Sequence, residues 1–563
     1  MVHLCNPAMR LITFCQSIVI DYRKDAERER TLDKEREERF SGKYPLLTSI
    51  PILSTVSRWL YTQTWLFTGL LLVIILLGFG LRLKGLGTMD FLEDEFQVIE
   101  AAYGYLQSGT FYRWEWLANG ISNNYYDRAW PHTLMITESF RWFGLSEWSA
   151  RLPSLIFGTL LIPLAYFLGK HATDRKVIAL MLAAIVAFSP KMIFLSQYAR
   201  MYVVFIPVFL IGSYLLFSGL EKKSPWRSNN VPLARWIMRY FDFDYRYLIT
   251  AAIVLYFSFL IHISTLLIGV GMFGYVFIMA FTTREERYLC LTGCISIILS
   301  VIIAGYAAGI QPFPSFFSWI DIYAPNKSEY FFFLFDYPFG IFLSLFLLAV
   351  LGVLIKKNRE LLYYLCLTVT ALAFFAFFSD RHSHFLYISN FMVIAWLLLL
   401  PGAAFIAYSF FRTRENIWQI VFSAFVLLAV FTPLMGTPGI LIEKYRVEDS
   451  MYCTFREGYA DLNAGYRDGD LLMAQYLRTY YITISGDIRI ESLQNYQSYS
   501  YDRFLDTTAR HDRIWITWET RKSYHIQPEI IEFVDAHFEK IHGEGIDETN
   551  VELYLWDKTR NHP

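Results

Sequence analysis

Long apolar runs separated by short polar connections occupy the chain from about residue 62 to residue 436. The hydrocarbon core of a bilayer takes about 20 apolar residues to cross, and about eleven segments meet that length. The pattern therefore predicts a polytopic α-helical membrane protein. The clearest spans lie at 62–82, 150–169, 177–195, 200–219, 289–309, 333–355, 361–378, 386–410 and 417–436.

The stretch Tyr247–Phe281 is too long for one perpendicular helix and barely long enough for two. We interpret it as a tight helical hairpin that turns near His262–Thr265. Short basic connections are held on the cytoplasmic side of a membrane, and with this hairpin all of them fall on one face. They are Lys170–Lys176, Glu221–Arg246, Arg284–Arg287, Lys356–Arg359 and Arg412–Arg414. The N-terminal segment, residues 1–60, is then expected in the cytoplasm.

The opposite face receives the long first exterior loop, residues 83–148, and the tail after the membrane domain of residues 61–436. In the tail, residues 437–563, strand-like runs at Leu471–Ala474, Ile514–Trp518 and Val551–Trp556 alternate with a helical pattern at Pro528–Ile541. This pattern predicts a small C-terminal extracytoplasmic α/β domain. We expect a multi-pass protein of the plasma or inner membrane with its chemistry on the extracytoplasmic side.

Composition supports a lipid environment. The 563 residues are 55% hydrophobic and 18% aromatic, and the mean hydropathy is +0.33, outside the usual balance of soluble domains. The formal net charge of -1 provides no basic surplus for nucleic acid. Membrane lipids are the partner that this composition predicts.

Three acids, Glu93 to Glu95, follow the first span and open a helical pattern that runs from Phe96 to Gln107. Carboxylates beside a membrane surface can serve as a general base or as metal ligands. The structural alternative is a capping box in which Asp94 caps the helix with Gln97 three residues later, and acids in a first turn also complement the helix dipole. Spacing alone favours the cap, and the two roles are compatible.

Cations gather at the same predicted boundary. Arg82 and Lys84 follow the first span on the side where basic residues are less expected. Arg200 and Tyr202 lie in a very short exterior turn, where a guanidinium can grip phosphate oxygens through two parallel hydrogen bonds. Snorkelling toward lipid headgroups and interfacial anchoring are the structural alternatives.

Three further residues could carry chemistry. His262 is an ionisable residue in an apolar segment, which indicates a functional site, although an interhelical hydrogen bond explains it equally. Arg381 and His384 lie in a short exterior turn, where they bind a headgroup or are simply solvated.

The order of motifs is more specific than any one of them. It resembles the C-type glycosyltransferases, especially the branch of protein O-mannosyltransferases and aminoarabinose transferases, densely from about Arg82 to Leu220 and more thinly to about Gly402. The motifs are, in order, a span, the Asp94-Glu95 pair, an interfacial helix, Trp130-Pro131-His132, the segment from Gly144 to Pro153, and Ser196-Gln-Tyr-Ala-Arg-Met-Tyr.

The resemblance implies roles for individual residues. The family's acidic pair falls on Asp94 and Glu95, with Asp94 as catalytic base or acceptor-orienting carboxylate. Its phosphate-binding cations fall on Arg200, and by position also on Arg82, Lys84 and Arg151.

On the acceptor side this chain departs from the family. His132 ends a Trp-Pro-His sequence where relatives carry Pro-Pro, and His384-Phe385 replaces an Arg-Tyr pair, which leaves Arg381 as a substitute. Some relatives bind a divalent metal through a loop acid and a membrane histidine, here Glu95 and His262, while others use none. The metal therefore stays open.

The function expected from the resemblance is transfer of a sugar from a polyprenol-phosphate donor to an acceptor glycan, lipid or protein, with inversion at the anomeric carbon. The alternative is a lipid or solute transporter, or a flippase, without transferase chemistry. Transporters place substrate groups near the bilayer midplane, whereas the polar candidates here collect at one surface.

Overall fold

A computed structural model describes residues 65–224, 240–309, 358–378, 391, 393–400, 455–475, 477–484, 487–493, 499–519, 526–543 and 551–559. The chain divides into two compact units. The first comprises residues 1–82, 154–196 and 201–439, and the second residues 83–153, 197–200 and 440–563.

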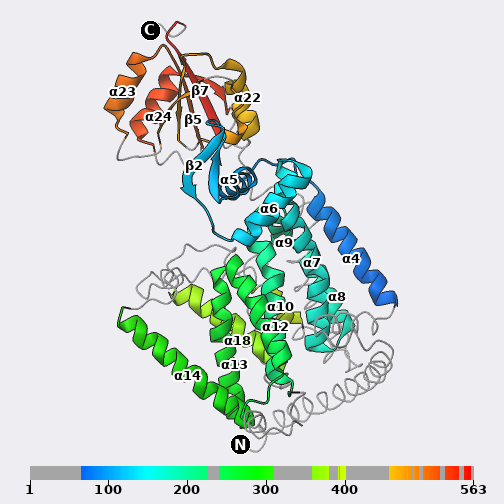
Figure 1. Cartoon of the computed structure of the whole chain (residues 1–563). Coiled ribbons are helices and arrows are strands. Elements are labelled where there is room, and N and C mark those ends of the chain that lie inside the picture. Colours follow the sequence, from blue (N-terminus) through cyan, green and yellow to red (C-terminus); the bar gives the residue numbers. More distant parts are fainter. Residues whose placement is uncertain are drawn as a thin grey trace, which may run out of the picture. The chain divides into compact units, whose positions relative to one another are not determined.

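The regular structure among the described residues of the first unit is helical, and Figure 1 shows its helices in blue to yellow-green. They are α4 (Trp65–Leu83), α7 (Glu147–Thr173, which begins in the second unit), α8 (Lys176–Phe188), α9 (Pro190–Ser196), α10 (Tyr202–Glu221), α12 (Tyr245–Ile261), η1 (Ile263–Leu266), α13 (Leu267–Thr283), α14 (Glu286–Ala307), α18 (Arg359–Ala373) and a π-helical turn η2 (Phe374–Phe378).

Four helices in the described part of the chain are long and apolar enough to cross a membrane. They are Glu147–Thr173, Tyr202–Glu221, Ile263–Thr283 and Glu286–Gly305, and Phe67–Leu83 and Tyr245–Ile261 are shorter apolar helices. Each lies in a predicted span or in the predicted hairpin. The spans predicted at 333–355 and 417–436, and most of 386–410, lie outside the described residues, as does the N-terminal segment 1–60.

The span predicted at 177–195 is not one straight helix. It consists of α8 and α9, which meet at an angle of 59°. Pro190 begins α9, and a proline disfavours helical geometry in the residue before it, here Ser189, which adopts an extended conformation (ψ 122°). If α8 and α9 together form one span, the described part of the chain holds up to five.

The predicted break at His262 is confirmed. Helix α12 ends at Ile261, and α13 begins at Leu267 after the short 3-10 turn η1. His262 has an extended backbone, and its Nδ1 accepts a hydrogen bond from the backbone N–H of Ser264 at 3.2 Å. The Ser258 and Thr265 hydroxyls lie 2.9 Å apart across the break, so the chain turns where the sequence pattern indicates.

The basic connections that were predicted to share one face contact one another. Arg359 forms ion pairs with Glu221 at 2.9 Å and with Glu285 at 3.3 Å. His171 Nδ1 lies 2.6 Å from the carboxylate of Glu360. Four of the five predicted connections therefore meet at one end of the helices, and the fifth, 412–414, lies outside the described residues.

The second unit combines the first loop with the tail. The loop forms α5 (Glu93–Ser108), the antiparallel strands β1 (Tyr112–Glu115) and β2 (Gly120–Tyr125), and α6 (Trp130–Phe143). The tail contains α22 (Phe455–Gly465), β3 (Leu471–Ala474), η4 (Thr479–Tyr481), β4 (Arg489–Ser492), α23 (Tyr501–Arg510), β5 (Arg513–Glu519), α24 (Pro528–His537), β6 (Glu539–His542) and β7 (Val551–Asp557).

The tail strands form one sheet in the order β4-β3-β5-β7-β6. Strand β3 pairs in parallel with β4 and β5, whereas β7 pairs antiparallel with β5 and β6. All three strand-like runs predicted from the sequence are strands. The helix predicted at Pro528–Ile541 ends at His537, and the next residues form β6.

Alternating residues of the strands line the two faces of this sheet. Met473, Ile514 and Ile516 pack with Phe504 of α23 and Val534 of α24. The other face is covered from two parts of the sequence, because its core contains residues of α22, α5 and the strands, namely Phe455, Tyr459, Phe96, Ile99, Leu472, Trp515 and Leu553. The helix that carries Asp94 therefore helps to build the hydrophobic core of the C-terminal sheet (Figure 1).

Candidate functional site

At the start of helix α5, the neighbouring acids Asp94 and Glu95 have different surroundings. Its N-cap is Leu92, and the carboxylate of Glu95 accepts a hydrogen bond from the Leu92 backbone N–H at 2.7 Å. The predicted cap by Asp94 with Gln97 is therefore wrong, because the helix starts two residues earlier than that pairing requires. Glu95 performs the capping, and Asp94 stands in the first turn with its side chain half-exposed.

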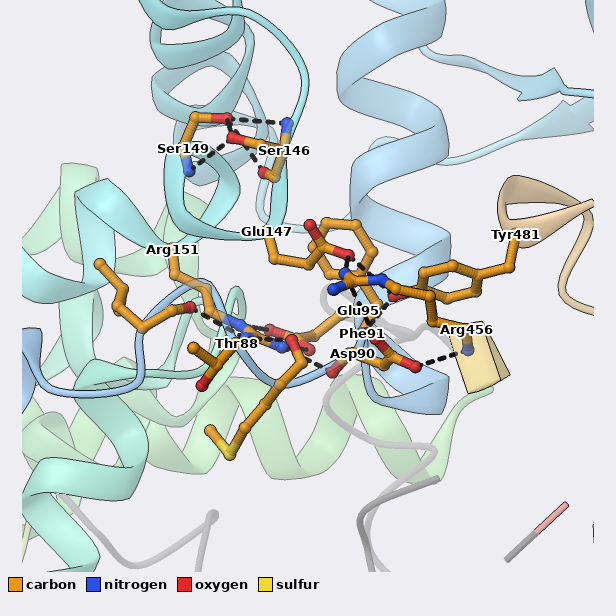
Figure 2. Close-up of polar contacts among 12 residues, drawn as sticks. Thr88, Asp90, Phe91, Glu95, Ser146, Glu147, Ser149, Arg151, Arg456 and Tyr481 are labelled. Atoms are coloured by element: carbon orange, nitrogen blue, oxygen red, sulfur yellow. Dashed lines mark hydrogen bonds and ion pairs between the residues drawn. The ribbon is translucent and has the colours of Figure 1, made fainter. Parts of the chain in front are cut away.

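Helix α7 starts at a reciprocal pair of serines. The Ser146 backbone N–H donates to Ser149 Oγ at 3.1 Å, and the Ser149 N–H donates to Ser146 Oγ at 3.3 Å (Figure 2). Such a pairing at the N-cap and third helical position satisfies two N–H groups that the helix leaves free. The start of α7 is thus fixed by local sequence, and Arg151 follows in its second turn.

Arg151 uses every one of its N–H groups within the protein. It donates twice to Glu95, at 3.0 and 2.8 Å, and to the carbonyls of Leu86, Met89 and Asp90 at 2.8–3.0 Å (Figure 2). Its side chain and that of Glu95 are 1% and 0% exposed. Resemblance implied a phosphate-binding role for Arg151, but its donors are committed to the loop before α5.

Glu95 is equally committed. Besides the contacts with Arg151 and Leu92, its Oε1 accepts the Ala199 backbone N–H at 2.6 Å. Both carboxylate oxygens are therefore hydrogen-bonded and the charge is paired within a dry environment. Glu95 therefore holds three parts of the chain together, and its catalytic role stays a prediction from the sequence.

Asp94 and Arg200, which are far apart in the sequence, meet in this unit. Arg200 Nη2 lies 3.4 Å from Asp94 Oδ2, and Arg200 Nη1 donates to the Asp94 carbonyl at 3.2 Å and to the Tyr126 hydroxyl at 3.0 Å. Arg200 is 3% exposed, whereas the Asp94 side chain is 46% exposed. The arrangement presents one accessible carboxylate beside a guanidinium held rigidly from several sides.

The two cations after the first span differ in their surroundings. Arg82 is fully buried and donates to the carbonyls of Gly78, Val186 and Ala187 at 2.8–3.0 Å and to Ser196 Oγ at 3.0 Å. It therefore joins α4 to α8 and α9, which differs from its predicted role at a phosphate. Lys84 is exposed, with no ion pair to another described residue, so its ammonium is available to an anion.

Tyr202 and His262 belong to the first unit. Tyr202 is 3% exposed at the start of α10, and its ring centroid lies 5.8 Å from that of His262. His262 Nδ1 lies 2.7 Å from the Ser264 hydroxyl, so the histidine caps the turn η1. Arg381 and His384, predicted at the acceptor or headgroup, lie outside the described residues.

His132 lies in the first turn of α6, after Pro131 at the position where proline fits a helix start. It is 1% exposed, and its Nε2 has no hydrogen-bond partner among the described residues. Burial, with the Arg200 charge as a second cause, lowers the pKa of His132 to about 3. The imidazole is therefore neutral at physiological pH.

The metal site suggested by the resemblance does not fit these residues. A carboxylate ligand must offer an oxygen lone pair and uncompensated charge to a cation, but Glu95 is paired with Arg151 and capped by two N–H groups. Within the described ranges, no group of three or more His, Cys, Asp and Glu side chains could hold a metal ion.

Two residues that sequence reasoning missed come from the C-terminal tail. Arg456 forms ion pairs with Asp90 and Glu147, and the Tyr481 hydroxyl bonds to Glu147 at 3.1 Å (Figure 2). More than 300 positions separate Arg456 and Tyr481 from their partners in the sequence, so no local pattern could indicate the contacts.

Comparison with known proteins gives matches of two kinds. The family model described as dolichyl-phosphate-mannose-protein mannosyltransferase matches residues 131–231. ArnT from Cupriavidus metallidurans, solved in the apo state and bound to undecaprenyl phosphate, is 12% identical with a TM-score of 0.50, over 88% of this chain and 99% of that one.

The oligosaccharyltransferase of Archaeoglobus fulgidus is 11% identical with a TM-score of 0.53, over 82% of this chain and 71% of that one. The archaeal oligosaccharyltransferase AglB from Archaeoglobus fulgidus, in complex with an inhibitory peptide and a dolichol-phosphate, gives a TM-score of 0.52 at 11% identity, over 84% of this chain and 72% of that one. No curated protein matches the sequence.

At these identities the solved structures establish the fold, and the family match adds support for a glycosyltransferase at the segment that carries His132, Arg151 and Arg200. The resemblance indicated by the order of motifs is thereby confirmed: this chain is a polytopic membrane protein with the fold of the C-type glycosyltransferases.

Proposed function

We propose that the protein transfers a sugar from a polyprenol-phosphate donor to an acceptor at the extracytoplasmic face of the membrane, with inversion of the anomeric carbon. The observation that carries the proposal is the pairing of the half-exposed Asp94 carboxylate with the buried Arg200 guanidinium, 3.4 Å apart. A carboxylate can activate the acceptor hydroxyl. A neighbouring cation can stabilise the charge on the departing phosphate.

In this mechanism Asp94 accepts the proton of the acceptor hydroxyl, or orients it, as the hydroxyl oxygen attacks the anomeric carbon. The new carbon–oxygen bond forms on the face opposite the breaking bond to the donor phosphate. Arg200 stabilises the charge that develops on the departing polyprenol phosphate, and the exposed Lys84 attracts the anionic donor. His132, whose buried Nε2 has no hydrogen-bond partner in the described part of the chain, is the residue that we propose on the acceptor side.

Sidedness supports this placement. The basic connections meet around Arg359 and His171, as cytoplasmic loops would. Helix α7 runs from Glu147, in the unit that holds Asp94, to Thr173, next to these basic connections. We therefore propose the extracytoplasmic side for the site and for the C-terminal sheet, which belong to the same unit.

Purified protein in lipid tests the proposal against the transporter or flippase alternative. Incubated with a pool of polyprenol-phosphate sugars and candidate acceptors, a transferase breaks the bond between sugar and phosphate and releases polyprenol phosphate. A transporter or flippase moves the lipid and leaves that bond intact. If the donor is recovered intact with every candidate acceptor, the proposal is overturned.

A further inference from the structure

The segment before α5 has no regular structure of its own, yet it decides where Asp94 stands. Residues Leu86 to Leu92 connect the turn after α4 to the helix start. On one side, Arg151 of α7 holds this segment through the carbonyls of Leu86, Met89 and Asp90. A segment held from one side only is free to move on the other.

The C-terminal tail supplies the second side. The Arg456 backbone N–H donates to Asp90 Oδ2 at 2.7 Å, and the Arg456 guanidinium lies 3.3 Å from Asp90 Oδ1. The Tyr481 hydroxyl accepts the Phe91 backbone N–H at 2.8 Å. Two consecutive residues, Asp90 and Phe91, are therefore bound by groups that lie more than 360 positions away.

The same two tail residues also bind the start of α7. Arg456 forms an ion pair with Glu147, and the Tyr481 hydroxyl donates to Glu147 Oε1 at 3.1 Å. The Tyr481 hydroxyl thus uses one lone pair for Phe91 and its proton for Glu147. Figure 2 shows Arg456 and Tyr481 together beside Asp90, Phe91 and Glu147.

The two carboxylates and Tyr481 are buried in these contacts, whereas the Arg456 side chain is 52% exposed. The side chains of Asp90 and Glu147 are 8% and 9% exposed, and Tyr481 packs its ring against Phe455 and Phe96 at centroid distances of 6.1 and 6.0 Å. Arg456 is the ion-pair partner of both carboxylates, whereas Arg151 is paired with Glu95. In such an environment, removal of one partner leaves the others unsatisfied.

We propose that Arg456 and Tyr481 are positioning residues: they fix the Asp90–Leu92 turn from which α5 starts, and so set the place of the Asp94 carboxylate. The C-terminal tail then contributes to the reaction without touching the substrate. This inference rests on the proposed function, but its structural half can be measured without any activity.

Tyr481→Phe removes the hydroxyl and keeps the ring, and Tyr480→Phe is a matched control. The Tyr480 hydroxyl has no hydrogen bond to another described residue, although its ring packs in the same cluster. Hydrogen–deuterium exchange of the purified full-length chain is followed in peptides that cover residues 86–96. We expect roughly 3- to 10-fold faster exchange in Tyr481→Phe, as loss of a buried hydrogen bond implies, and wild-type exchange in Tyr480→Phe.

Transfer kinetics form the second measurement. Tyr481→Phe and Arg456→Gln should lower kcat while the KM for the donor stays near the wild-type value, and Arg456→Lys should recover part of the loss. Glu147→Gln supplies the same test if Tyr481→Phe does not fold. Unchanged exchange in residues 86–96 would overturn the inference, as would faster exchange with wild-type kcat. Wild-type protein without transfer activity would refute the proposed function and leave the exchange result standing.

Discussion

At the scale of single residues, the neighbours Asp94 and Glu95 have opposite surroundings. Glu95 is buried, capped by two N–H groups and paired with Arg151, whereas Asp94 is half-exposed beside Arg200. Because adjacent residues of a helix point about 100° apart, one acid can enter the core while the next remains accessible. Of the two acids, only Asp94 presents an accessible carboxylate.

The buried pair should be costly to break. In Glu95→Gln, Arg151 keeps its charge without a counterion, and we expect a loss of about 3 to 5 kcal/mol in the free energy of unfolding. Thermal unfolding of the purified protein measures it. Glu138→Gln is the control, because Glu138 and Arg141 form a half-exposed ion pair that contributes about 0 to 1 kcal/mol. Equal melting temperatures for the two variants would contradict this account.

His132 makes stability depend on pH. Its pKa is lowered from 6.5 to about 3 in the folded protein, so below pH 6.5 the unfolded chain takes up a proton that the folded protein excludes. Stability is therefore lost as the pH falls. Between pH 6.5 and 5 the wild type should lose roughly 2 kcal/mol more than His132→Gln. Melting temperatures over this range test it, and parallel curves would refute the pKa assignment.

The sequence indicated which residues lie together in this unit, but it did not indicate the contacts that each of them makes. Asp94, Glu95 and Arg200 were selected from their predicted place at the membrane boundary, and Arg151 from the resemblance; all four lie in one unit. The partners that engage Glu95 and Arg151 are the backbone N–H groups of Leu92 and Ala199 and three loop carbonyls. Backbone partners leave no side-chain signature in a sequence, so these contacts of Glu95 and Arg151 could not be predicted.

At the scale of elements, α5 is held between two partners. Phe96 and Ile99 enter the core of the C-terminal sheet, and Gly104 permits close approach of β1. A Cβ atom on Gly104 would lie 2.0 Å from the Tyr112 carbonyl oxygen, and a backbone atom cannot swing aside. The glycine is required for the packing of this helix against the strand.

Gly104→Ala should therefore destabilise the protein by about 1 to 3 kcal/mol despite the better helix propensity of alanine. Gly69→Ala, also within a helix, has no atom within 4 Å of its added Cβ and should leave the melting temperature unchanged or higher. A Gly104→Ala protein as stable as Gly69→Ala would show that α5 and β1 are not packed as described.

Periodicity predicted most of the described helices and three strands within a few residues, because each has a strong local pattern. Strands β1, β2, β4 and β6 were missed. Strand β4 is largely exposed and lacks the apolar alternation that marks a strand, and β6 follows α24 with only Phe538 between them. The bend at Pro190 was also missed, because the apolar run continues through it.

At the scale of the whole molecule, the account requires Asp94 and the basic connections to lie on opposite sides of the membrane. Single cysteines at positions 138 and 286, in an otherwise cysteine-free chain, report these two locations. In intact cells an impermeant maleimide should label Glu138→Cys directly and Glu286→Cys only after permeabilisation. Labelling of both from outside would contradict the proposed sidedness.

The pairing of the first loop with the tail was beyond sequence reasoning. The tail was expected to be a domain of its own, whereas the second unit joins residues 83–153 and 197–200 to residues 440–563 around a shared core. Each segment shows its own amphipathic pattern, but nothing in those patterns states that Phe96 and Trp515 share a core. This arrangement is what gives Arg456 and Tyr481 their access to the segment before α5.

The most direct test of the central claim is the rate of sugar transfer by Asp94→Asn with purified protein and a polyprenol-phosphate donor. The account predicts that this variant folds, binds donor and transfers about 10²- to 10⁴-fold more slowly than wild type, while Glu138→Gln keeps the wild-type rate. Transfer by folded, donor-bound Asp94→Asn at the wild-type rate would contradict it.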